Sequence, residues 1–181
     1  MISINDIHDY FSCNHKNERK TLRDTSRSNG DYLTERTQYA YHFDSIVDGS
    51  YSSCDALFIS PDQNCIYLIE FKNQPCIKAD KNPPKDINNN LKLKATDSLI
   101  FLYNKFKQEK LLNSRSEMLK LKKKMIIVYS EEKTNYQIDI TQRSRVFAKV
   151  GYIFQVENYA DYLYDDIVVI PNTKFEDYEL K

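Results

Sequence analysis

Two acidic residues and one lysine lie next to the apolar runs of the segment SSCDALFISPDQNCIYLIEFKN, residues 52–73. Asp55 precedes the run ALFI, and Glu70 and Lys72 follow the run CIYLI. Burying charged side chains costs free energy unless they are paired or hold a metal ion. Two carboxylates at close range favour a cation between them, and a hard divalent ion such as Mg²⁺ takes oxygen ligands. With a lysine alongside to hold or deprotonate a water, this set is suited to attack of water on a phosphodiester.

The segment predicts a β-hairpin that would bring these side chains together. Strands are expected at residues 54–60 and 65–73, where apolar residues occur at alternate positions on both faces. Strands that are apolar on both faces are typical of the centre of a sheet. The intervening SPDQN favours a tight turn, because Pro presets φ and Asp and Asn stabilise turns locally.

The register of this hairpin determines which side chains meet. If Ser60 faces Cys65, then Asp55 lies directly opposite Glu70. Directly opposed residues of an antiparallel pair share one side of the sheet, with Cβ atoms about 4.5–5.5 Å apart. Lys72 lies two residues beyond Glu70 and therefore shares the same side. The alternative to a metal site is a structural salt bridge between Lys72 and the two acids.

The remaining patterns predict a single α/β domain over residues 1–181. Residues 74–87 contain two adjacent prolines and read as a loop, and apolar residues at helical spacing then predict an amphipathic helix at 87–106. The other expected elements are a helix at 4–11, a helix end and loop at 14–30, a strand at 38–47, a helical piece at 108–121, and strands at 125–130 and 166–171. The expected architecture is a mixed central sheet with an N-terminal antiparallel meander and flanking helices.

The pattern D-(14 residues)-E-F-K on two adjacent strands, followed by a helix, resembles the PD-(D/E)XK nuclease superfamily, which has the restriction-endonuclease-like fold. The resemblance covers roughly residues 35–130. It implies that Asp55 and Glu70 bind one or two Mg²⁺ ions, for which Mn²⁺ is a substitute, and that the backbone carbonyl of Phe71 is a further ligand. It also implies that Lys72 positions or activates the attacking water.

The resemblance suggests one further acidic residue. Members of the superfamily commonly carry another glutamate on the first helix, and the candidates here are Glu35 and Glu18. Glu35 is favoured because it lies just before the first expected strand.

The distribution of charge favours an anionic partner. The net charge of the chain is zero, but residues 72–124 carry 14 basic and 5 acidic side chains, net +9. Phosphate backbones are bound largely by such side chains. Lys92 and Asp97, or Lys94, are candidates to point toward the site from the expected helix, although a solvated helix face explains each one as well. The candidate phosphate contacts are Lys78, Lys81, Lys85, Lys92 and Lys94.

These observations lead to the expectation of a Mg²⁺-dependent endonuclease, with DNA favoured over RNA as its substrate. The alternative is a catalytically inactive binding, immunity or assembly protein of nuclease fold. Cutting both strands of a duplex needs two sites, so a homodimer is compatible with this class, but the sequence shows no interface. The N-terminus lacks the pattern of a signal peptide and the apolar runs are too short to cross a membrane, so a cytoplasmic location is expected.

Overall fold

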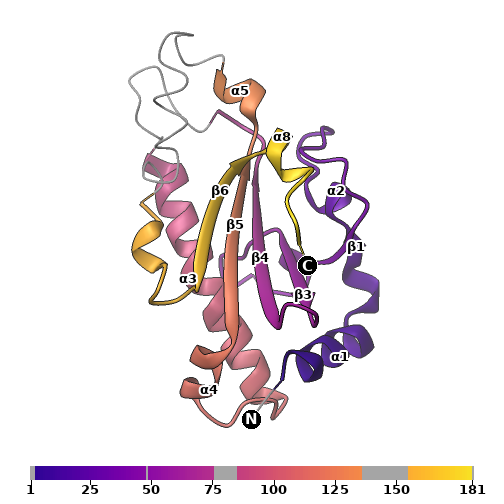
Figure 1. The fold of residues 1–181 in the computed structure, drawn as a ribbon, viewed down its shortest axis with the longest axis vertical. Helices are drawn as coiled ribbons and strands as arrows, with labels where there is room; N and C mark the ends of the chain where they lie inside the picture. The colour runs from indigo at the N-terminus through magenta and orange to yellow at the C-terminus, as the bar shows by residue number, and fades with distance from the viewer. Residues whose placement is uncertain (1–2, 48, 76–84, 136–154, 181) are drawn as a thin grey trace.

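The computed structural model describes residues 3–47, 49–75, 85–135 and 155–180 of the chain (Figure 1). Their strands form one six-stranded sheet in the order β1-β2-β3-β4-β5-β6. The strands from β1 to β4 pair in antiparallel fashion, whereas β5 is parallel to both β4 and β6. The strands are β1 (Arg19–Thr21), β2 (Tyr39–His42), β3 (Ala56–Ser60), β4 (Cys65–Lys72), β5 (Lys122–Tyr129) and β6 (Asp166–Pro171). The expected α/β class, with a mixed sheet and an N-terminal antiparallel meander, is confirmed.

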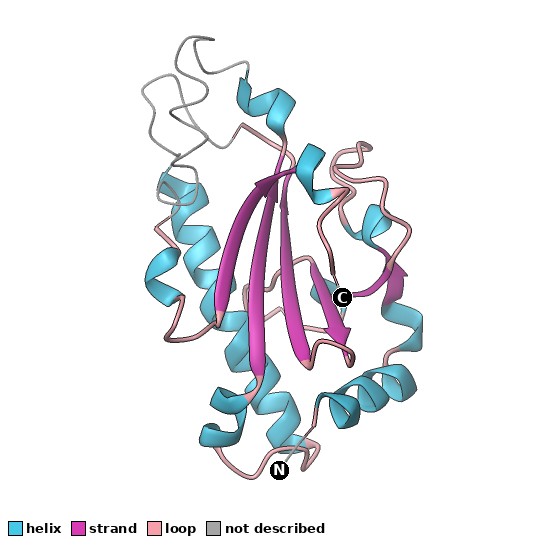
Figure 2. Cartoon of the chain, viewed as in Figure 1, coloured by secondary structure: helices cyan, strands magenta, loops and turns pink. Residues whose placement is uncertain are grey.

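Helices flank this sheet (Figure 2). The first begins with a capping box, in which the hydroxyl of Ser3 accepts a hydrogen bond from the N–H of Asp6 and the Asp6 carboxylate accepts one from the N–H of Ser3. The α-helices are α1 (Ile4–Asn14), α2 (Leu22–Thr25), α3 (Lys85–Gln108), α4 (Arg115–Lys120), α5 (Glu131–Asn135) and α8 (Asn172–Phe175). The 3₁₀ helices in the described ranges are η1 (Lys16–Glu18), η2 (Phe43–Ser45) and η3 (Glu157–Tyr159). Among the described helices, none has an apolar stretch long enough to cross a membrane.

The β3–β4 hairpin has the expected register. Ser60 faces Cys65, and Ala56 at the other end of β3 faces Ile69. The turn is closed by the N–H of Asn64, which donates to the carbonyl of Pro61 at 3.0 Å. Asn64 has a φ of +50°, a left-handed conformation that asparagine adopts more readily than most residues. Both strands are central in the sheet, as their apolar character predicts.

The sheet separates two apolar cores. Leu68 of β4 faces the core formed with α1 and α3, whereas its neighbour Ile69 faces the second core, which includes α2 and α8. Helix α3 passes behind the strands in the view of Figure 1. Because side chains alternate along a strand, Glu70 lies on the same side as Leu68 and is directed toward α3. The alternation therefore places the candidate site between β4 and α3.

Two expectations about the N-terminal region are wrong. The strand expected at 38–47 ends at His42, because the chain turns there into η2 and buries Phe43 in the core with α1 and α3. The segment 14–30, expected as a helix end and a loop, contains β1 and α2. Strand β1 is polar and only partly buried, and its pairing with β2 is a long-range contact that leaves no local apolar pattern.

Candidate active site at the carboxyl end of strand β4

Asp55 lies where strand β3 begins, and its carboxylate bonds to the neighbouring strand. The N–H of Phe71 donates to Asp55 Oδ2 at 2.6 Å. The chain before Asp55 turns away toward α3, where the N–H of Cys54 donates to the hydroxyl of Ser98 at 3.0 Å. The side chain of Asp55 thus satisfies a backbone donor of β4 just before the first residue of β3. This contact fixes the orientation of the carboxylate.

Glu70 and Lys72 form an ion pair on the side of β4 that faces α3. The carboxylate of Glu70 is 1% exposed, and its Oε1 lies 2.6 Å from the Nζ of Lys72. Lys72 also donates to the Oδ1 of Asn90 in α3, at 3.1 Å. The lysine is therefore held between its own strand and the helix that covers it.

One ammonium group lies between the two acids. The Nζ of Lys94, on α3, is 3.2 Å from Asp55 Oδ1 and 2.8 Å from Glu70 Oε2. A single cation therefore contacts both carboxylates, which confirms that Asp55 and Glu70 converge on one side of the sheet. Each of the four carboxylate oxygens has a protein donor. Lys94 Nζ contacts one oxygen of each acid, the Phe71 N–H donates to the second oxygen of Asp55, and Lys72 Nζ contacts the second oxygen of Glu70.

Burial and mutual repulsion change the proton affinities of this cluster. Burial, and then the negative charge of Glu70, raise the pKa of Asp55 to about 7, although Lys94 and the Phe71 N–H oppose this shift. Burial disfavours the charged form of Lys94, but Glu70 and Asp55 together outweigh this effect and raise the pKa of Lys94. A cation between the two acids is therefore strongly favoured, because it offsets the repulsion between their negative charges.

A polar stripe on α3 contributes to this site. Asn90, Lys94 and Ser98 follow one another at a spacing of four residues, so they lie on one face of the helix. Asn90 contacts Lys72, Lys94 contacts the two acids, and Ser98 contacts the backbone before Asp55. The sequence prediction included Lys94 as a phosphate contact and missed Asn90 and Ser98. Their spacing, next to the buried Leu91 and Ala95, was the available signal.

The structure places Glu35 away from the acids, so its assignment to this site is corrected. Its carboxylate is 74% exposed and pairs with Arg23 at 2.7 Å. The adjacent Thr34 donates to Glu176, and Leu33 packs in the core on the face of the sheet opposite α3. The loop between α2 and β2 folds over that second face, which the position of Glu35 in the sequence does not reveal. The alternative candidate, Glu18, lies in η1, 3.9 Å from His15.

The other predicted phosphate contacts, and Asp97, which was expected to point toward the site, have different placements. Lys92 donates to the Oε1 of Gln155 at 2.9 Å on the exposed side of α3. Asp97 accepts from the N–H of Ser52 at 3.1 Å, so it holds the segment that leads to Asp55. Lys78 and Lys81 lie outside the described residues, and the described part of Lys85 is its backbone at the start of α3.

The carboxylate oxygens of this site are suitable ligands for a small hard cation. Two acidic side chains already share one positive group, and carboxylate oxygens are the ligands that Mg²⁺ and Mn²⁺ prefer. The N–H and C=O of a strand residue point to the same edge, so the carbonyl of Phe71 faces the side on which its N–H meets Asp55. Among the described residues, no group of three or more His, Cys, Asp or Glu side chains is arranged so that it could hold a metal ion. A divalent ion would therefore have to take the place of the Lys94 ammonium.

Comparison of the chain with models of protein families, with curated proteins and with solved structures found no match.

Proposed function

We propose that this protein is a metal-dependent nuclease that hydrolyses phosphodiester bonds, with Asp55 and Glu70 as ligands of Mg²⁺ or Mn²⁺. The observation that supports the proposal most directly is the convergence of the two carboxylates on one cation, with the ammonium of Lys72 bonded to Glu70. The superfamily that the D-(14 residues)-E-F-K pattern resembles uses the same residue types on adjacent strands.

Each residue of the cluster has a distinct part in this proposal. A divalent ion held by Asp55 and Glu70 would stabilise negative charge on a phosphodiester oxygen and acidify a water. Lys72, tethered by Glu70 and Asn90, would orient that water or take part in its deprotonation. The Phe71 N–H keeps one oxygen of Asp55 occupied, so the other oxygen of that carboxylate faces the cation.

Lys94 links cation binding to substrate binding in this scheme. Its ammonium must leave the two acids when a divalent ion enters, and its side chain would then be available for a phosphate oxygen of the substrate. The substrate is proposed to be nucleic acid, because residues 72–124 carry a net charge of +9 and supply Lys94 next to the acids. DNA is favoured over RNA only because most members of the superfamily that the sequence pattern resembles cut DNA.

The test is cleavage of plasmid DNA and of total RNA in Mg²⁺ by the purified chain and its variants. Lys72→Met should lower the cleavage rate at least about 100-fold, the lower bound for a well-positioned acid–base group. Asp55→Asn, which removes a proposed ligand of the divalent ion, should lower the rate by at least as much. Glu35→Gln is the matched control, because it removes an acid that pairs with Arg23 and does not contact the cluster. Cleavage by Asp55→Asn and Lys72→Met at the rate of the unmodified chain would reject the proposal.

A second candidate function is favoured by the bonding of Lys94. Because every oxygen of the two acids has a protein donor, the cluster is electrostatically complete without a metal ion. The fold would then carry a catalytically silent binding, immunity or assembly protein. This alternative predicts that Mg²⁺ and Mn²⁺ do not raise the melting temperature, whereas a metal-binding nuclease is stabilised by RT ln(1 + [L]/Kd).

A further inference from the structure

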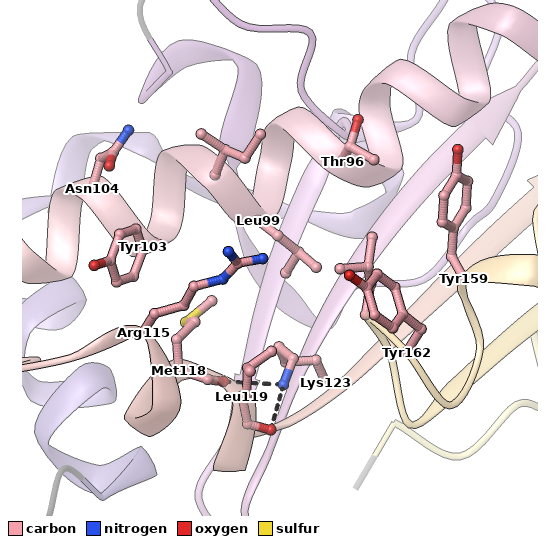
Figure 3. Close-up of a pocket in the computed structure, with 12 residues that line it drawn as sticks. Thr96, Leu99, Tyr103, Asn104, Arg115, Met118, Leu119, Lys123, Tyr159 and Tyr162 are labelled. Atoms are coloured by element: carbon pink, nitrogen blue, oxygen red, sulfur yellow. Dashed lines mark hydrogen bonds between the residues drawn. The ribbon is translucent and has the colours of Figure 1, made fainter.

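A separate cavity of about 550 Å³ lies between α3, α4 and residues 159–163 (Figure 3). Its walls are mostly apolar, and the volume falls within the range of pockets that hold small molecules. The apolar side chains that line it are Leu99, Ile100, Met118, Leu119 and Leu163, together with three tyrosines at positions 103, 159 and 162.

Exposed apolar side chains gather at this cavity. Ile100 is 48% exposed, Leu119 is 53% exposed and Tyr162 is 71% exposed. They are three of the five large hydrophobic residues exposed in the described part of the chain. Single exposed apolar residues are common on protein surfaces, but a cluster around a cavity marks a binding site.

The charges at the cavity are positive. Figure 3 shows the guanidinium of Arg115 extending over the cavity, between Tyr103 and Tyr162. The described residues that line the cavity include no carboxylate, and Arg115 forms no ion pair within the described part of the chain.

The second cation, Lys123, is already engaged. Its buried Nζ donates to the carbonyl of Met118 at 3.1 Å and also to the carbonyls of Leu119 and Leu121, which end α4. Lys123 therefore adds positive charge to the cavity wall, while Arg115 keeps donors for a ligand.

We propose that this cavity binds a small amphipathic anion with an aromatic body and one carboxylate or sulfonate group. The apolar walls and the tyrosines would enclose the body, and Arg115 would bind the oxyanion, whose geometry matches the guanidinium fork. The cavity is independent of the proposed nuclease site. Thr96 lines the cavity and Lys94 contacts the acids. These two residues are two positions apart on α3, which is about 200° around a helix of 3.6 residues per turn, so they lie on nearly opposite sides of the helix.

Two fluorescent probes that differ in one anionic group test this proposal. They are 1-anilinonaphthalene-8-sulfonate and the uncharged N-phenyl-1-naphthylamine, titrated into the full chain. Both should bind one per chain. Arg115→Gln should weaken binding of the sulfonate about tenfold, the scale of one charge-assisted contact at a partly exposed site, and leave binding of the uncharged probe unchanged.

Two further variants control for charge and for location. Lys120→Gln removes a positive charge from the same helix at a residue that does not line the cavity, so it should change neither affinity. Ile100→Trp places a larger side chain at the mouth of the cavity and should abolish binding of both probes without lowering the melting temperature. Equal effects of Arg115→Gln and Lys120→Gln, or probe binding that does not saturate at one per chain, would overturn the proposal. The proposal would also be overturned if the chain self-associates and Ile100→Trp disrupts that association, since a second copy of the chain would then cover the cavity.

Discussion

Replacing Lys94 by methionine is the sharpest test of the cation position between the two acids. Methionine is unbranched and one atom shorter than lysine, has nearly the same helix propensity, and removes the positive charge. In EDTA, the variant leaves Glu70 paired with Lys72 alone and Asp55 bonded to the Phe71 N–H alone. The repulsion between the two carboxylates then lacks the one cation that contacts both of them.

The size of the effect follows from burial. The Lys94 side chain is 15% exposed and Glu70 is almost fully buried. Removing one partner of a buried ion pair costs about 3–5 kcal/mol, and the lower end applies here because each acid keeps one other donor. A loss of about 3 kcal/mol in a chain of this length lowers the melting temperature by about 6–12 °C.

Divalent ions should then distinguish the two candidate functions. If Asp55 and Glu70 bind Mn²⁺, Lys94→Met removes the competing ammonium, so Mn²⁺ should raise its melting temperature more than that of the unmodified chain. The stabilisation reaches about 2.7 kcal/mol when the ion exceeds its Kd a hundredfold. Isothermal calorimetry on the same samples gives the affinity directly, without any assay of cleavage.

The control for this experiment is Lys92→Met, on the exposed side of the same helix, where the lost contact is the one to Gln155. It should change the stability by no more than about 0.5 kcal/mol, as for most surface substitutions. A Lys94→Met variant as stable in EDTA as the Lys92→Met control would refute the electrostatic reasoning. A destabilised Lys94→Met variant that Mn²⁺ fails to rescue would instead reject the metal site and favour the silent binding protein.

Three further predictions concern other parts of the molecule. Glu35→Gln should lower the melting temperature by no more than about 4 °C, because its ion pair with Arg23 is largely exposed and contributes about 0–1 kcal/mol. Leu102→Ala should lower the free energy of unfolding by about 2–5 kcal/mol in urea denaturation, because Leu102 is fully buried in the core beneath α3, and a cost below about 1 kcal/mol would contradict that placement. Burial lowers the pKa of His15 below its ordinary 6.5, so the unfolded chain binds more protons than the folded chain at mildly acidic pH. The free energy of unfolding should therefore fall as the pH drops through about 6.5. His15→Gln should reduce this dependence of stability on pH, measured by urea denaturation between about pH 5 and 7.5. The charged and titratable groups that influence His15 are Glu18, Lys105 and Glu109.

The hairpin could be predicted because its determinants are local. The turn residues after Ser60 fix the register, and a shift by one residue would turn every apolar side chain of β3 and β4 to the wrong face. Once Ser60 faces Cys65, strand alternation determines that Asp55, Glu70 and Lys72 share one side. The helical spacing of apolar residues likewise predicted most of α3, with boundaries within two residues of the expected ones.

The misplacement of Glu35 shows where local reasoning ends. Its position before strand β2 was predicted well enough, but the side of the sheet it reaches depends on the loop that leads from α2 to β2. That loop is held by contacts with the distant C-terminal segment, including Thr34 with Glu176 and Arg36 with the carbonyls of Phe175 and Tyr178. Contacts across more than 130 residues leave no periodic signal in the sequence.

The sequence by itself determined that two acids and a lysine meet at the end of a central hairpin, because the alternation of strand side chains and the chemistry of one turn are local properties. Only the tertiary structure decided which cation lies between the acids. Several lysines precede or belong to α3, and the rotation of that helix against the sheet, set by the packing of Leu91, Ala95 and Leu102 in the core, directs Lys94 inward and Lys92 outward. That rotation depends on packing against side chains from distant strands and helices, so no short stretch of sequence contains it.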